Sequence, residues 1–281
     1  MAVKDILVHV DDTERGKVRL DLATAIARRT DSRVIGLGVS PRFTIPAFVN
    51  AEIPAQVWEA QEAEMAKRME ATRAVFKRHA ERAGVATEWR EISADIDSIA
   101  DLMATHARYA DLTVLGQPDP DRAVGGLDMD TVERVVITAG GPVLVVPYAG
   151  QFANVGKRAM LAWNASREAA RAMHDARAVL EKGAKVVVMY VNPPGRDHAQ
   201  RDIAGVDIAT HLARHGYKAE ATHTMAEDIK VGDMILSRAA DAGADSIVMG
   251  AYGHSRLREF VLGGATAHVL RHMTVPVLMS H

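Results

Sequence analysis

The sequence predicts an α/β fold of two tandem doubly wound domains, each a parallel sheet of five strands with helices on both faces. Short apolar, β-branched runs alternate with segments of helical periodicity along the chain, a pattern typical of βαβ units with right-handed crossovers. The succession of runs then repeats, so residues 1–150 and 151–281 are expected to form two similar domains. A chain of 281 residues is long enough to give each domain its own core.

An internal repeat is the strongest support for two domains. Four segments recur in the same order, and the matched pairs are 6–13 with 160–166, 33–39 with 185–191, 110–116 with 244–250, and 141–146 with 275–280. The two later pairs share one spacing of 134 residues, so this part of the first half can be compared position by position with the second. We therefore interpret the chain as a tandem duplication.

The first half is expected to contain five strands and at least two helices. Its apolar runs predict strands at 5–10, 33–39, 87–92, 112–115 and 143–146. Helical periodicity predicts a helix over 16–29 and a long amphipathic helix over 54–83. Between about Pro41 and Trp58 the first half carries 18 residues more than the second. We interpret this apolar insert as a surface loop resting on the core, with a lid or a partner contact as the alternative.

The second half repeats the alternation. Its predicted strands are 159–163, 185–190, 218–223, 246–249 and 277–279. Its predicted helices include 166–182, 233–242 and 265–273. Each half thus has the strands and intervening helices that one doubly wound sheet requires.

Composition excludes several classes of function. A formal net charge of −2 gives no electrostatic argument for a nucleic-acid partner. The absence of cysteine excludes disulfides, thiolate metal sites and thiol nucleophiles. No apolar stretch approaches the length of a membrane span, and the N-terminal run is too short for a signal peptide. We expect a cytoplasmic protein with neither nucleic-acid nor membrane partners.

A glycine pattern near the end of the chain is the strongest candidate site. A predicted strand stops at Gly250, Gly253 follows in the loop, and Gly263 and Gly264 open a helix. Glycines at these positions let the backbone approach a phosphate, and the helix start offers unpaired N–H groups and a positive dipole end. Each glycine alone is explained as an ordinary turn or cap residue, but four together between a strand and a helix favour an anion site.

These residues resemble the nucleotide-binding members of the universal stress protein family. That family carries a glycine, two residues, a glycine, nine residues, and then a glycine followed by Ser or Thr; Gly250, Gly253 and Gly263 match this spacing. Gly264 departs from the pattern, because it keeps the backbone N–H and lacks the hydroxyl. A hydrogen bond to a charged group contributes about 1.5–3 kcal/mol, so affinity falls by about one or two decades unless Thr266 compensates.

The resemblance implies a Rossmann-like domain that binds ATP or a related adenine nucleotide, with or without Mg²⁺. An aspartate after the family's first strand lies beside the ribose; the second half has Asn164 there, which keeps an oxygen acceptor and loses the charge. Helix capping by Asn164 or Ser166 is the alternative. Val191 matches the position whose backbone meets adenine. The candidate nucleotide contacts are Asn164, Val191, Met249, Gly250, Gly253, His254, Ser255, Gly263, Gly264, Ala265 and Thr266, with no catalytic or metal-binding residue.

The first half lacks the glycine pattern. Asp119 stands where the second half has Gly253, and Asp130 stands where it has Gly264. Two carboxylates at these positions would repel a polyphosphate. We therefore expect a degenerate nucleotide site in the first domain.

Three functions are compatible with this sequence. The first is a regulatory binder of an adenine nucleotide in the second domain. The second is a ligand-free dimerisation and interaction protein of the same fold, which Gly264 and Asn164 favour. The third is a slow ATP hydrolase, for which only His254 offers a general base.

Resemblance to the family, together with the need to pair exposed sheet edges, predicts how the two halves meet. Strands 143–146 and 277–279 are expected at a shared edge, so that the chain forms a pseudo-dimer about a pseudo-twofold axis. A homodimer of two such chains stays an open alternative.

Overall fold

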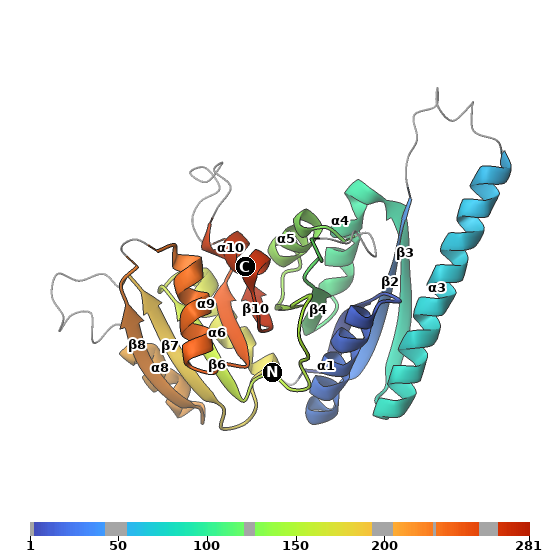
Figure 1. The fold of residues 1–281 in the computed structure, drawn as a ribbon. Helices are drawn as coiled ribbons and strands as arrows, with labels where there is room; N and C mark the ends of the chain where they lie inside the picture. Colours follow the sequence, from blue (N-terminus) through green and yellow to red (C-terminus); the bar gives the residue numbers. More distant parts are fainter. Residues whose placement is uncertain (1–2, 43–54, 121–126, 193–204, 227–228, 253–263) are drawn as a thin grey trace.

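The structure, a computed structural model, describes residues 3–42, 55–120, 127–192, 205–226, 229–252 and 264–281. Within these residues the chain forms one ten-stranded sheet in the order β3-β2-β1-β4-β5-β10-β9-β6-β7-β8 (Figure 1). The strands are β1 (Asp5–Val10), β2 (Arg33–Arg42), β3 (Thr87–Asp95), β4 (Leu112–Gly116), β5 (Val143–Val146), β6 (Arg158–Trp163), β7 (Lys185–Val191), β8 (Lys218–Thr224), β9 (Ser246–Gly250) and β10 (Val277–Ser280). The predicted strands are all present, and β2 and β3 run further than expected.

The two halves share one topology. Each is a parallel five-stranded sheet in which the first strand lies in the middle, β1 between β2 and β4, and β6 between β7 and β9. The halves join through β5 and β10, which pair antiparallel with Leu144 opposite Leu278. This confirms the predicted shared edge and the pseudo-twofold relation between the domains.

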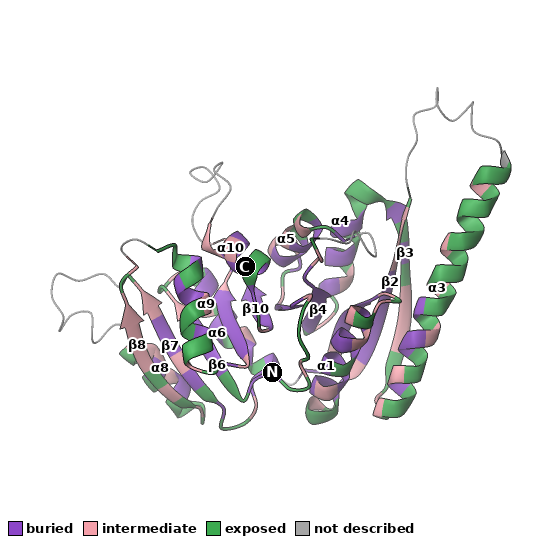
Figure 2. Ribbon diagram, in the orientation of Figure 1, coloured by how far each residue is buried: buried purple, intermediate pink, exposed green. Residues whose placement is uncertain are grey.

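Helices cover both faces of the sheet (Figure 1). One hydrophobic cluster joins the sheet to α1 (Glu14–Thr30), α3 (Ala55–Ala83), α6 (Arg167–Asp175) and α8 (Val206–Arg214). A second cluster joins the opposite face to α4 (Ile96–Ala107), α5 (Met129–Thr138), α9 (Val231–Asp241) and α10 (Ala265–His272). Figure 2 shows the buried residues concentrated on the sheet and on the helix faces that touch it. The molecule is therefore a three-layer α/β/α sandwich.

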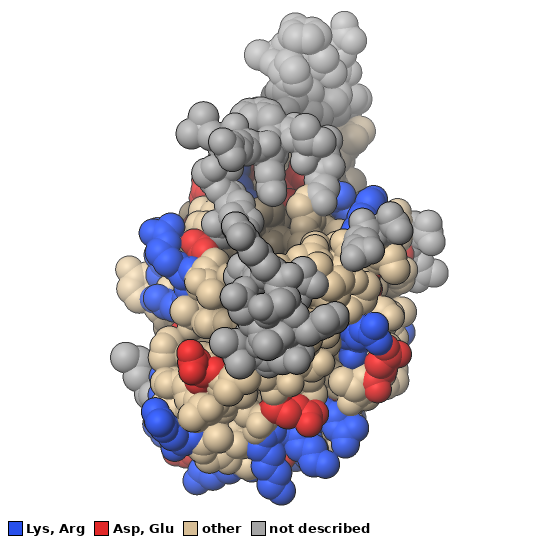
Figure 3. Space-filling view, turned by 90° about the vertical axis from the view of Figure 1, so that its left-hand side faces the viewer, with Lys and Arg blue, Asp and Glu red and all other residues tan. Residues whose placement is uncertain are grey.

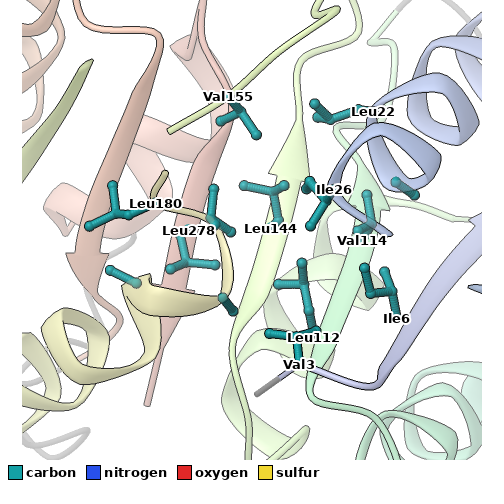
Figure 4. Close-up of a cluster of buried hydrophobic side chains, with 14 of the residues drawn as sticks. Val3, Ile6, Leu22, Ile26, Leu112, Val114, Leu144, Val155, Leu180 and Leu278 are labelled. Carbon is teal, nitrogen blue, oxygen red and sulfur yellow. The ribbon is translucent and has the colours of Figure 1, made fainter. Parts of the chain in front are cut away.

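One core runs through the junction between the halves. Leu144 of β5 and Leu278 of β10 are both fully buried, and they belong to the same cluster as Ile26 of the first domain and Leu180 of the second. Figure 4 shows these side chains gathered around the β5–β10 pair. Burial of a leucine side chain contributes about 1.5–3 kcal/mol, so the junction is a stabilising part of the core.

One predicted helix was too long. The segment expected as a helix over 166–182 is α6 to Asp175, followed by a short 3-10 turn, Ala176–Ala178. The reason lies in hydrogen bonds to residues of this chain that are remote in sequence. The Val179 carbonyl accepts a hydrogen bond from the Arg29 guanidinium of the first domain, and the Glu181 N–H donates to the Gly156 carbonyl at 2.9 Å. These bonds replace the helical ones.

The long helix of the first domain is seated by two glycines in β2. A Cβ on Gly36 would lie 2.7 Å from the Phe76 ring, and a Cβ on Gly38 would lie 2.5 Å from the Met69 sulfur. The glycines therefore let α3 approach the sheet. Of the insert predicted between about Pro41 and Trp58, residues 41–42 belong to β2 and residues 55–58 to α3. Residues 43–54 lie outside the described residues, and so does the choice between a surface loop, a lid and a partner contact.

Candidate functional site

The second domain has its topological switch point between β6 and β9. From β6 the chain proceeds outward to β7 and β8, and it then returns to the other side of β6 for β9 and β10. Ligands of doubly wound sheets bind in the crevice beyond the carboxyl ends of the strands at such a point. The ends of β6, β7 and β9 at Trp163, Val191 and Gly250 therefore bring Asn164 and the other candidates to one edge of the sheet.

The end of β9 is shaped by close packing. A Cβ on Gly250 would lie 2.5 Å from the backbone nitrogen of Ala169, at the start of α6. Glycine is therefore required here by the fold itself, whatever binds beside it. Met249 is 5 % exposed and packs in the core, so only its backbone is available at the crevice.

The N-terminus of α10 faces this edge without a side-chain cap. Gly264 is the N-cap residue with φ −59° and ψ 157°, and no acidic residue stands in the first turn that begins at Ala265. Thr266 is 8 % exposed, and its hydroxyl accepts a hydrogen bond of 3.3 Å from the Tyr252 N–H. The hydroxyl thus ties the chain after β9 to α10. Gly253, His254, Ser255 and Gly263 lie outside the described residues.

The turn after β6 shows the capping chemistry that the sequence left open. The Asn164 side-chain oxygen accepts a hydrogen bond of 3.1 Å from the Ser166 N–H, and the Ser166 hydroxyl accepts one of 3.2 Å from the Ala169 N–H. Ser166 is therefore the N-cap of α6. Asn164 itself is exposed at the rim, and Val191 is half-buried at the end of β7, opposite Thr224.

The equivalent turn of the first domain has the same backbone bonds and a different charge. The Asp11 carboxylate accepts a hydrogen bond of 3.0 Å from the Thr13 N–H, and Thr13 caps α1. Asp11 also forms an ion pair with Arg19, and these two side chains are only 12 % and 6 % exposed. Burial raises the pKa of Asp11, but the Arg19 charge and the hydrogen bonds from Thr13 and Arg19 outweigh it and hold the pKa at about 2.

Arg19 occupies the crevice of the first domain. Its guanidinium lies against Gly116 at the end of β4, where a Cβ would come within 2.4 Å of Nη1, and its Nε donates to the His9 carbonyl at 3.2 Å. This role of Arg19 was not predicted from the sequence. An arginine on an otherwise apolar helix face, at the position that the repeat aligns with Ala172 of the second domain, was the feature that could have indicated it.

His9 was also missed by the sequence analysis. It is 2 % exposed on β1, and neither ring nitrogen has a hydrogen-bond partner among the residues that the structure describes. Burial, reinforced by the Arg19 charge and opposed by Asp11, lowers the pKa of His9 to about 4. The ring is therefore neutral at physiological pH. The repeat aligns it with Ala162, so the first domain fills this part of its sheet with a larger side chain.

The helix that corresponds to α10 in the first domain starts with acidic residues. The Asp128 carboxylate caps α5 by accepting a hydrogen bond of 2.8 Å from the Thr131 N–H, and Asp130 is exposed in the first turn. Asp130 and Asp119 were predicted from the sequence, and Asp128 was not. An acidic cap satisfies the helix donors that an anion would otherwise meet.

His268 and His272, four residues apart on α10, contact each other and α9. His268 bonds to Asp233 of α9 at 2.6 Å and stacks on His272 with ring centroids 4.3 Å apart. Among the described residues no group of three or more potential ligands could hold a metal ion. In the same part of the chain, no helix is long and apolar enough to cross a membrane.

Comparisons with known proteins agree with this architecture. A universal stress protein of Synechocystis sp. is 30 % identical over 152 residues, which are 52 % of this chain and 49 % of that protein, so the chain spans about half the length of this curated relative. The structure resembles that of a universal stress protein from Archaeoglobus fulgidus DSM 4304, with a TM-score of 0.73 and 17 % identity over 98 % of this chain and 95 % of the other.

A second solved structure, from Pseudomonas aeruginosa UCBPP-PA14 and assigned to the universal stress proteins, has a TM-score of 0.62 and 17 % identity over 99 % of this chain and 93 % of the other. At these identities both structures bear on the fold alone. The model of the universal stress protein family matches residues 2–147 and again residues 156–281. The chain therefore belongs to the universal stress protein family, in a tandem arrangement of two family domains.

Proposed function

We propose that the second domain binds one adenine nucleotide, in the first instance ATP, and that the protein acts as a regulatory nucleotide binder in the cytoplasm. The observation that carries the proposal is the uncapped, glycine-opened N-terminus of α10 at the switch point of a universal stress protein domain. The lack of cysteine is compatible with a reducing cytoplasm.

The phosphates would meet the start of α10. The first N–H groups of a helix have no helical acceptor, and here neither a capping side chain nor a first-turn carboxylate competes for them. Figure 3 shows that Lys and Arg alternate with Asp and Glu over the outer face of the second domain. In this proposal, the attraction for the phosphates comes from the helix terminus and the glycine loop.

The ribose and adenine would lie toward β6 and β7. The oxygen of Asn164 keeps a second lone pair beyond its bond to Ser166, and its amide group supplies donors, so both can face ribose hydroxyls. Val191 offers its backbone to adenine, as in the family pattern. Because Asn164 is neutral, any Mg²⁺ would be held chiefly by the nucleotide phosphates.

The first domain would bind no nucleotide. Its crevice holds the Arg19–Asp11 ion pair, and expelling Arg19 would leave Asp11 buried without its partner. At the start of α5, the Asp128 carboxylate accepts a hydrogen bond from a helix N–H and Asp130 adds a second negative charge, whereas the start of α10 has neither carboxylate. We therefore propose one nucleotide per chain.

A charge exchange between the two domains tests where the phosphates bind. Gly264→Asp places at α10 the carboxylate that Asp130 places at α5, and the extended dihedral angles of Gly264 accept an aspartate. We expect MgATP affinity, measured by calorimetry, to fall tenfold or more. Asp130→Gly is the matched control and leaves the affinity unchanged. Equal affinities of wild type and Gly264→Asp would contradict the proposal.

A ligand-free interaction protein is the second candidate. It is favoured by two observations, since packing against α6 already explains Gly250 and the Thr266 hydroxyl is engaged by Tyr252. This function predicts no heat of binding at millimolar MgATP and no change on Gly264→Asp. For a slow ATP hydrolase, the one candidate base, His254, lies outside the described residues.

A further inference from the structure

The helix that would face the phosphates is short. α10 has eight residues and is therefore about 12 Å long. A helix of this length is marginal by itself, so tertiary contacts fix its position. Whatever holds its far end therefore also sets where its N-terminal donors stand.

The C-terminus of α10 has no cap of its own. The last helical residue is His272, and the C-cap residue, Met273, is extended with φ −63° and ψ 140° instead of left-handed. The last carbonyls of such a helix have no helical donor. Gln117 of the first domain supplies it, because its Nε2 donates to the Leu270 carbonyl at 2.8 Å and to the Arg271 carbonyl at 3.0 Å.

Gln117 is itself firmly placed. It follows directly after β4 and is 5 % exposed. Its side-chain oxygen accepts a hydrogen bond of 3.1 Å from the Tyr148 N–H, and its backbone N–H donates to the Val146 carbonyl at 2.8 Å. All polar groups of the side chain are thus used, two of them on the helix of the other domain.

The contact is one-sided within the pseudo-symmetric molecule. The repeat aligns Gln117 with Ala251, which has no amide to offer α5. At the end of α5, the Thr138 carbonyl instead accepts hydrogen bonds of 3.3 and 3.4 Å from Arg108 of its own domain. Just beyond α5, the Gly140 carbonyl accepts a hydrogen bond of 3.2 Å from Arg171 of the second domain. Among the described residues, however, α10 is the one α-helix whose own carbonyls accept hydrogen bonds from a side chain of the other domain.

A second cross-domain contact lies beside the first. The Glu133 carboxylate of α5 is 4.0 Å from the Arg271 guanidinium of α10. Arg271 lies in the last turn of α10, so this ion pair is a further contact of the first domain with the C-terminal end of the helix.

We infer that Gln117 is a positioning residue for the nucleotide site: a first-domain side chain fixes α10 from its C-terminus and so places the phosphate donors at its N-terminus. The inference rests on the proposed function. It gives the first domain, which would itself bind no nucleotide, a definite part in the affinity of the second.

Gln117→Met tests the inference, since it keeps the length of the side chain and removes both donors. We expect the dissociation constant for MgATP to rise about fivefold, the effect of about one net hydrogen bond, while adenosine affinity stays unchanged because adenosine has no phosphates. Arg108→Met is the matched control, as it removes the donors at the end of α5 and leaves both affinities as in wild type.

The outcomes separate the inference from the function on which it depends. Wild-type protein that binds no MgATP would contradict the proposed function. If wild type binds MgATP and the MgATP-to-adenosine affinity ratio of Gln117→Met equals that of wild type, the positioning role is overturned and the proposed function stands. This holds whether both affinities are unchanged or both fall equally. Should Gln117→Met not fold, Gln117→Asn keeps the amide and shortens its reach toward α10, and the same ratio decides.

Discussion

Two residues at aligned positions, Arg19 and Ala172, make the crevices of the two domains different. Both lie on the helix that follows the central strand, but only Arg19 reaches the end of β4 and pairs with Asp11. The apolar pattern of that helix could be predicted from the sequence. The pairing of Arg19 with Asp11 could not, because the contact joins the helix to residues at the ends of two strands. The carboxylates of Asp119 and of Asp130, in the first turn of α5, were the part of this difference that the sequence made visible.

Replacing Arg19 by alanine should destabilise the protein strongly. Asp11 would remain buried without its counter-charge, and breaking a buried pair by removing one partner costs about 3–5 kcal/mol. The free energy of unfolding in urea measures the effect. Arg33→Ala is the control, since Arg33 pairs with Asp5 and Glu88 at the surface and its loss should destabilise the protein far less. Similar losses for the two variants would show that the Arg19 pair is not effectively buried.

His9 should make stability depend on pH. Its folded pKa of about 4 is below the ordinary value of 6.5, so between these values the unfolded chain binds the extra proton. The contribution of the neutral ring is fully present above pH 6.5 and is lost as the pH falls toward 4, by about 3 kcal/mol in all. Asp11, with a folded pKa of about 2, adds a separate loss below about pH 4.

The variant His9→Leu isolates this contribution. It replaces an unpartnered buried ring by an apolar side chain, so the difference in unfolding free energy between variant and wild type should grow as the pH falls from 6.5 to 4. Urea unfolding at several pH values provides the measurement. A difference that is constant across this range would mean that His9 is protonated in the folded protein.

At the scale of elements, regular segments were predictable and tertiary exceptions were not. Apolar runs located the inner strands, and the glycine pair before Ala265 located the start of α10. The two edge strands, β3 and β8, are of mixed polarity, and their place in the repeated order of elements supported their prediction. The end of α6 was misplaced because Arg29, remote in sequence, bonds to the Val179 carbonyl. The capping of α10 by Gln117 was equally invisible, since a glutamine after a strand carries no pattern of its own.

At the scale of the molecule, duplication has produced one sheet with two unlike halves. The β5–β10 pair and the core around Leu144 and Leu278 bind the domains into a single layer of ten strands. Resemblance to the family, together with the need to pair exposed sheet edges, predicted this joint. The proposed division of labour, nucleotide binding by the second domain alone, rests on side chains that differ between the halves. Arg19 and Asp11 fill the crevice of the first domain, whereas the start of α10 in the second has no capping side chain of its own.

The stoichiometry of nucleotide binding tests this division of labour most directly. Calorimetric titration of the purified full chain, stripped of nucleotide, with MgATP should give one site per chain. Because that site is proposed to lie in the second domain, Gly264→Asp should weaken MgATP binding, while Asp130→Gly leaves the number of sites at one. Two sites per chain would contradict the closure of the first domain by Arg19 and Asp11, and no binding at millimolar MgATP would contradict the nucleotide site itself.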